Sequence, residues 1–133
     1  MIAAIADTHA TVWYLFDDPR LSRSAREAFQ QAVVSGDKVG VSAISLAEIV
    51  YLCEKGRIPA NSLEGTLALI HDPERVLTAV PLDYRIVEEM KRIPRGDVPD
   101  LPDRIIAATG LRLGVPVISR DAKIRAANLR TIW

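Results

Sequence analysis

Short apolar runs alternate along the chain with longer segments in which apolar residues recur every three or four positions. The runs have the length and aliphatic character of strands buried on both faces, and the longer segments have the period of helices packed on a core. The pattern predicts four strands and a last edge strand at residues 1–6, 38–42, 76–80, 115–119 and 129–133.

Polar capping residues mark where several of the intervening helices begin. Ser22 or Ser24 is expected to cap the second helix, and Ser45 and Glu48 have the spacing of a capping box at the head of the third. Residues 94–102 carry three prolines and a glycine, which excludes regular structure there. Helices are expected at 7–16, 22–35, 45–56, 59–71, 83–90 and 103–113, with a short one from 121.

Strands that alternate with helices predict a parallel sheet covered by helices on both faces. The expected fold is therefore a three-layer α/β/α domain with a central, mostly parallel sheet. The chain has no internal repeat or linker, so residues 1–133 are expected to form one domain. In such sheets ligands bind at the carboxyl ends of the strands, which is where a functional site is expected.

Three acids follow strands closely. Asp7 comes directly after the first strand, Glu48 one short turn after the second, and Asp121 after the fourth with only Arg120 between. Asp103 begins the helix that leads to the fourth strand, and it joins the same edge only if the loop 94–102 brings it there.

Each of these acids has a simpler interpretation as a helix cap or a first-turn acid that favours the helix dipole. Four carboxylates gathered at one edge are harder to explain by capping. Two carboxylates about 5 Å apart repel by about 3 kcal/mol at an effective dielectric near 20. A bound cation would relieve that repulsion, so the four acids predict a metal site if they converge.

The composition narrows the choice of metal and of partner. The single cysteine excludes an intramolecular disulfide and a thiolate zinc site, and the oxygen ligands favour Mg²⁺ or Mn²⁺. With 17 basic and 17 acidic residues the net charge is zero, so a nucleic acid would have to be bound by a local basic patch. The N-terminus has no basic region and no apolar span, so a cytoplasmic protein without a membrane segment is expected.

Four segments of the chain resemble the signature segments of the PIN-domain nucleases, and most closely the VapC-type toxins of prokaryotic toxin–antitoxin pairs. The match covers essentially the whole chain in the right order. The segments are Ala6-Asp7-Thr8, Ser42-Ala43-Ile44-Ser45-Leu46-Ala47-Glu48-Ile49, Leu101-Pro102-Asp103-Arg104-Ile105-Ile106-Ala107-Ala108-Thr109 and Ser119-Arg120-Asp121.

The resemblance implies a PIN-like fold and an endoribonuclease that depends on Mg²⁺ or Mn²⁺, acting as the toxin of a type II pair in a prokaryotic cytoplasm. It implies a homodimer and a cognate antitoxin as partners, with RNA as the substrate. Catalytic and metal-binding roles are implied for Asp7, Glu48, Asp103 and Asp121. A non-catalytic PIN-like scaffold that binds RNA or protein is the alternative, and none of the four acids is missing as such a scaffold would usually require.

Residues beside the four acids have supporting interpretations. Thr8 is a candidate to hydrogen-bond a ligand carboxylate or a metal-bound water, or it is an ordinary first-turn hydroxyl. Asp100 is a possible supporting ligand, although loop acids are usually solvated. His9 is a possible general base or a packed helix residue. Arg120 and Lys123 are candidates for contact with RNA phosphates, or they merely solvate a face.

Two other classes with acids at strand ends do not fit the residues. A receiver domain would need a second acid beside Asp7 and a lone aspartate after the third strand, and Val80-Pro81-Leu82 does not supply it. A haloacid-dehalogenase phosphatase would need an aspartate at position 9, which is His9. Separately, the bulky residues 13–16 cannot all face inward on one helix, so part of them is a candidate partner surface.

Overall fold

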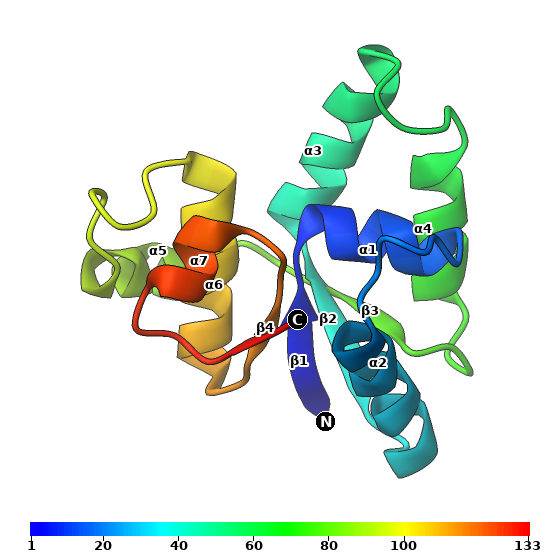
Figure 1. Ribbon diagram of the computed structural model, residues 1–133, viewed down its shortest axis with the longest axis horizontal. Coiled ribbons are helices and arrows are strands. Elements are labelled where there is room, and N and C mark those ends of the chain that lie inside the picture. The colour runs from blue at the N-terminus through cyan, green and yellow to red at the C-terminus, as the bar shows by residue number, and fades with distance from the viewer.

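Five parallel strands form the centre of the computed structural model, which describes all 133 residues (Figure 1). Their order across the sheet is β3-β2-β1-β4-β5, and every neighbouring pair is parallel. The strands are β1 (Ile2–Ala6), β2 (Lys38–Ser42), β3 (Leu77–Val80), β4 (Val117–Ile118) and β5 (Thr131–Ile132).

Helices cover both faces of the sheet, so the expected three-layer α/β/α fold is confirmed (Figure 1). On one side lie α1 (Thr8–Leu15), α2 (Arg23–Ser35), α3 (Ala43–Glu54) and α4 (Ser62–His71). On the other side lie α5 (Tyr84–Glu89), the 3₁₀ turn η1 (Met90–Arg92), α6 (Leu101–Leu113) and α7 (Ala122–Ala126).

The strands bury both of their faces, as their apolar runs predict. Side chains alternate between two clusters: Ala4 and Ala6 belong to the cluster under α1 and α2, whereas Ile5 between them belongs to the cluster under α5 and α6. Phe29 is fully buried in the first cluster and Ile106 in the second. The sheet therefore lies between two apolar cores, one under each helical layer.

Several boundaries differ from the sequence-based expectation: α4 begins at Ser62 rather than 59, α6 begins at Leu101 rather than 103, and β5 spans only Thr131–Ile132. Two further differences have a clear cause. The prediction of a capping box at Ser45 and Glu48 is wrong. Helix α3 begins at Ala43 and its cap is Ser42, whose hydroxyl accepts from the Ile44 amide. Strand β4 is shorter than residues 115–119, since the Val115 amide bonds back to the Gly110 carbonyl at the end of α6. A strand cannot begin until the helix has used its last hydrogen bond.

The strand order reverses at β1. The chain runs outward from β1 through β2 to β3, and then crosses to the opposite side of β1 to form β4 and β5. The carboxyl ends of β1 and β4 therefore diverge into different connections at a topological switch point, where parallel sheets bind their ligands. No helix in the chain is both long and apolar enough to cross a bilayer.

Candidate active site

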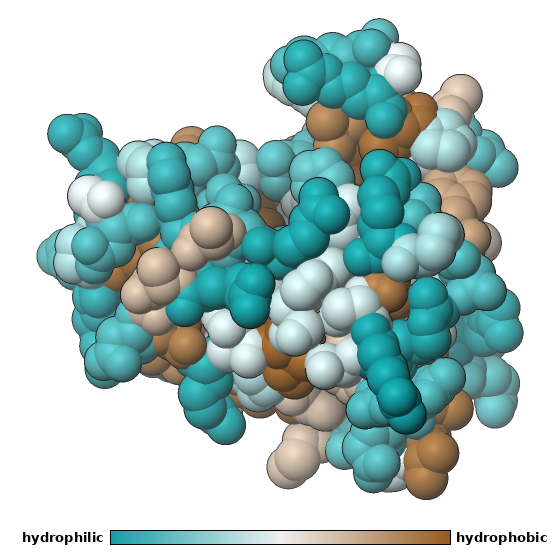
Figure 2. Space-filling model, viewed as in Figure 1, coloured by the Kyte–Doolittle hydropathy of each residue, from teal (hydrophilic) through white to brown (hydrophobic).

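A cavity of about 450 Å³ opens at this switch point, beyond the ends of β1 and β4. In Figure 2 the surface is hollowed between the projecting end of α3 and the lobe formed by α5, α6 and α7. Its lining is almost entirely polar, with five carboxylates and one arginine. The nine lining residues are Asp7, Thr8, His9, Trp13, Glu48, Asp100, Asp103, Arg120 and Asp121.

The four acids singled out in the sequence thus meet in one cavity, together with Thr8, Asp100 and Arg120. Asp103 reaches it because the loop 94–102 returns the chain to the carboxyl edge of the sheet before α6 begins. Lys123 is different: its side chain is exposed on α7 and does not line the cavity.

Asp7 is fixed by the end of β1 and the start of α1. Its amide donates to the Ile118 carbonyl of β4, and its Oδ1 accepts from the Ala10 amide at 2.8 Å as the cap of α1. The side chain is only 8% exposed, and burial raises its pKa above the ordinary value. Hydrogen bonds from Ser119 and Ala10 act in the opposite direction on that pKa.

Glu48 is held by a neighbour from another helix. The Thr8 hydroxyl on α1 donates to Glu48 Oε1 at 2.6 Å, and Thr8 Oγ1 lies 3.1 Å from Ser45 Oγ. Burial raises the Glu48 pKa, the bond from Thr8 lowers it, and the negative charge of Asp100 raises it further. Ser45, expected to cap its own helix, instead contacts the residue that orients Glu48.

Asp100 and Asp103 share the first turn of α6. Asp100 caps the helix, and its Oδ1 accepts from the Asp103 amide at 3.1 Å. The pKa of Asp103 is raised to about 7, first by burial and then by the charges of Asp100, Asp121 and Glu48. An acid surrounded by other acids on one side and apolar packing on the other holds its proton near neutral pH.

Asp121 completes the ring of acids as the cap of α7. Its Oδ1 accepts from the amides of Lys123 and Ile124 at 2.9 and 3.0 Å, and its own amide donates to Ser119 Oγ. Asp7, Asp100 and Asp121 are therefore all helix caps, as the simpler interpretation of the sequence proposed for two of them, and they also line one cavity.

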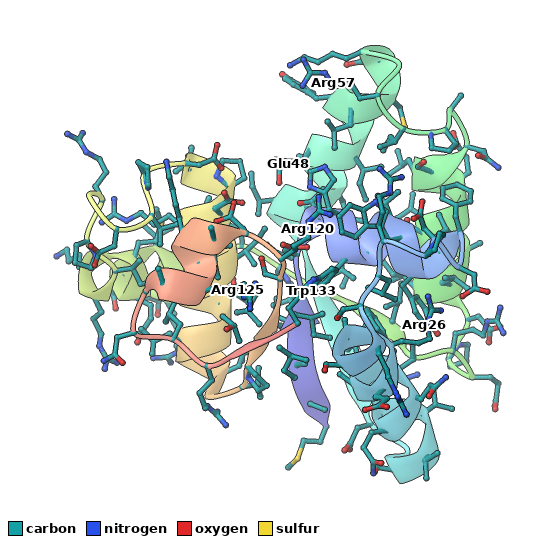
Figure 3. All side chains as sticks on the ribbon, in the orientation of Figure 1. Arg26, Glu48, Arg57, Arg120, Arg125 and Trp133 are labelled. Carbon is teal, nitrogen blue, oxygen red and sulfur yellow. The ribbon has the colours of Figure 1, made fainter.

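The one arginine that lines the cavity, Arg120, lies on an aromatic ring. The Arg120 guanidinium is 4.6 Å from the centre of the Trp13 ring, a distance at which the ring attracts it. Arg120 forms no ion pair within 4.0 Å although it lines the cavity with five carboxylates. Figure 3 labels Arg120, from the segment between β4 and α7, and Glu48 of α3, which both line the cavity.

Trp13 is the part of the lining that the sequence did not assign to the site, and it shares a helix with His9, which the sequence offered as a possible general base. They are four residues apart on α1 and their rings are 5.6 Å apart. The spacing itself was a usable signal, since residues i and i+4 share a helix face and Asp7 sits at the start of that helix. Trp13 is 4% exposed, so it contributes an edge to the cavity and its bulk to the core.

The donor set fits a hard divalent cation. It consists of carboxylate and hydroxyl oxygens with no thiolate, which suits Mg²⁺ or Mn²⁺. No three His, Cys, Asp or Glu side chains converge on one ion position. Mg²⁺ commonly takes one or two protein carboxylates and completes its shell with waters and substrate phosphates, so the wider ring of acids suits it.

The fold and the cavity define the chain as a three-layer α/β/α domain with an acidic site at the switch point of its parallel sheet. The sequence profile of the PIN domain matches residues 4–128. The chain belongs to the PIN domain family.

Relatives with names or solved structures share nearly the full length. The chain is 27% identical to a protein named Ribonuclease VapC22 from Mycobacterium tuberculosis, over 95% of this chain and 92% of that one. Its fold is similar to that of VapBC2 from Rickettsia felis, crystallised with a promoter DNA fragment (TM-score 0.72, 14% identity, 98% and 97% coverage). It also resembles DNA-bound VapBC from Salmonella typhimurium (TM-score 0.68, 19% identity, 98% and 97% coverage).

Proposed function

We propose that this chain is an endoribonuclease that depends on Mg²⁺ or Mn²⁺ and hydrolyses RNA phosphodiester bonds. The observation that carries the proposal is the convergence of Asp7, Glu48, Asp103 and Asp121 in one cavity at the sheet's switch point. Membership of the PIN domain family and the similarity to a named ribonuclease support the same activity.

Asp7 and Asp103 are the residues we assign as direct ligands of the ion. Asp7 is the most buried of the acids, and the pKa of Asp103 is raised to about 7. Glu48 and Asp121 would hold waters of the ion's shell, or a second ion. A bound divalent cation lowers the pKa of a water ligand and draws charge from the nonbridging phosphate oxygens.

The chain's own side chains would order the reactants. Thr8 fixes one oxygen of Glu48 and leaves the other free to accept a proton from the attacking water. Arg120, which lines the cavity without a carboxylate partner, would bind a phosphate oxygen. Lys123 on the adjacent α7 would contact a phosphate farther along the strand.

The biological setting we propose is that of a toxin in a type II toxin–antitoxin pair in a prokaryotic cytoplasm. The named relative and the toxin–antitoxin complexes among the similar structures support an antitoxin partner. We further propose that the chain forms a homodimer. The partly exposed side chains of Phe16 and Tyr51, 39% and 66% accessible, belong to the apolar surface available for such partners.

Asp7→Asn is the test of the activity. The substitution keeps the shape of the side chain and its ability to cap α1 through the amide oxygen, but removes the charge that binds the ion. We expect it to reduce cleavage of a single-stranded RNA in Mg²⁺ by at least about 100-fold, the scale of losing an essential charge-stabilising group. Circular dichroism should remain unchanged.

Asp83→Asn is the matched control, because Asp83 caps α5 in the same way but lies outside the cavity. Its cleavage rate should equal that of the parent. Full cleavage by the parent in EDTA would contradict metal dependence, and full cleavage by Asp7→Asn would contradict the assignment of the site.

A further inference from the structure

A second cavity of about 250 Å³ lies beside the acidic one, and His9 and Trp13 line both. It is formed by α1 and the segment that follows it, and by the end of α3 with the turn beyond. The residues that give it its character are Phe16, Arg20, Leu52, Arg57 and Ile58. The catalytic steps proposed above use none of these five, and only Phe16 has been given another role, in the surface offered to protein partners.

The walls of this second cavity combine apolar and planar cationic surfaces. Phe16 is 39% exposed, and Leu52 and Ile58 are half-buried beside it. The Arg20 guanidinium is fixed by two bonds to Asp18, at 3.0 and 2.8 Å, and lies 5.1 Å from the Trp13 ring. Apolar rings and fixed guanidinium planes are the surfaces on which unpaired bases stack.

The charge around this cavity favours a polyanion. Arg20 is neutralised by Asp18, but Arg57 is exposed and forms no ion pair, and neither does Arg120 on the other side of the shared wall. Figure 3 shows Arg57 beyond the projecting end of α3 and Arg120 near its beginning. Two free cations therefore flank the path from one cavity to the other.

We propose that the second cavity is a nucleobase subsite, which receives one unpaired base of the RNA next to the phosphate held at the acids. The proposal rests on the proposed function and adds the part of the substrate that the site recognises. A strand whose phosphate lies among the acids passes over His9, and its neighbouring base enters the cavity while Arg57 contacts the backbone. A paired base is held in its stack, so cleavage is confined to single-stranded RNA.

The test is a binding cycle between one protein side chain and one base. The probe is a fluorescein-labelled single-stranded RNA of twelve nucleotides, together with versions in which each position in turn carries an abasic ribose. Fluorescence anisotropy gives the dissociation constant with Ca²⁺ in place of Mg²⁺, so that a hard cation is available between the acids and the phosphate. A gel confirms that the RNA stays intact during the measurement. The proteins are the parent, Phe16→Ala and Arg57→Ala, with Tyr84→Ala as the control for an exposed aromatic outside both cavities.

We expect Phe16→Ala to weaken binding of the intact RNA by about 5- to 100-fold, the range of one lost base stack. The same variant should bind one of the abasic RNAs as well as the parent does, because the base that Phe16 contacts is already missing. Arg57→Ala should weaken intact and abasic RNAs alike and reduce the slope of log affinity against log salt by about 0.7. Tyr84→Ala should change neither.

Three results overturn the subsite: equal effects of Phe16→Ala on every abasic RNA, no effect of either variant on RNA binding, or a loss confined to binding of an antitoxin protein. Circular dichroism identifies a Phe16→Ala variant that fails to fold. In that case Leu52→Ala takes its place, since Leu52 lines the same wall. Failure of the nuclease proposal gives a different result. The parent would then show no Mg²⁺-dependent cleavage, while the coupling between Phe16 and one base of the RNA would still be measured in the binding cycle.

Discussion

The charge conflict at Asp103 predicts that a point mutation will stabilise the metal-free protein. Asp103→Asn removes a charge from the cavity while keeping the side chain's shape. Most substitutions destabilise a protein. This one should do the opposite, because the folded chain buries the Asp103 carboxyl and holds it beside Asp100, Asp121 and Glu48, whereas the unfolded chain exposes it to water and separates the charges.

The magnitude follows from the pKa. A rise from 3.8 to about 7 makes ionisation of the Asp103 carboxyl cost roughly 4 kcal/mol more in the folded state. The side chain is partly exposed, and solvent screening reduces the effect on stability to about 1–3 kcal/mol. A loss of about 0.3–1 kcal/mol from the dipole of α6 opposes it and is smaller.

The sign of the pH dependence is fixed by the direction of the shift. Because the folded pKa is the higher one, the folded state binds more protons between pH 4 and pH 7, and stability falls as the pH rises through that window. The parent and Asp103→Asn should therefore be nearly equal in stability near pH 4. The advantage of the variant should grow with pH and reach its full size at about pH 8.

Urea unfolding in EDTA at pH 4.5 and pH 8, followed by circular dichroism, measures the difference in free energy. Glu64→Gln is the matched control, because Glu64 is also a first-turn acid, on α4, but lies outside the cavity. Its variant should lose about 0.3–1 kcal/mol at pH 8. An Asp103→Asn protein less stable than the parent at pH 8 in EDTA would refute the crowding and leave Asp103 as a first-turn acid only.

Three further outcomes follow from the same site. Adding Mg²⁺ at 100 times its dissociation constant should stabilise the parent by about 2.7 kcal/mol, and Asp103→Asn much less, in thermal melts. Thr8→Val should cost about 1–3 kcal/mol of stability, because it leaves the Ser45 hydroxyl and the Glu48 carboxylate without their partner, and it should lower kcat more than it changes KM. Arg120→Ala should raise KM and reduce the slope of log affinity for RNA against log salt by about 0.7. Lys123→Ala, outside the cavity, should weaken RNA binding and leave kcat unchanged.

Most of the fold could be predicted because local patterns and tertiary structure agree. The apolar runs gave the positions of all five strands, and Ser22, Gly36 and Asp83 cap helices as their residue types predict. Asp7 and Asp121 could be placed at the sheet edge because each follows a strand within three residues. For these residues the local sequence alone is enough to predict their place in the fold.

Other parts of the site depend on contacts between distant segments. Asp103 joins the cavity through the path of the loop 94–102, which no periodicity describes. The true start of α3 was obscured because Ser42 and Ser45 are both good caps, and the choice depends on Thr8, 37 residues before Ser45. Arg120 lies on Trp13 through packing of α1 against the end of β4, which the sequence does not display.

Capping a helix does not exclude the metal-binding role proposed for the aspartates of this site. Asp7, Asp100 and Asp121 each cap a helix through Oδ1 alone, which leaves Oδ2 free of backbone bonds. The bond that a cap makes holds the carboxylate in one orientation before any ion arrives, so the ion does not have to order these side chains when it binds. An Asn at these positions retains the capping oxygen but supplies an amide in place of the second one. The two functions can therefore be separated experimentally, because Asn variants should keep their helices and lose the ion.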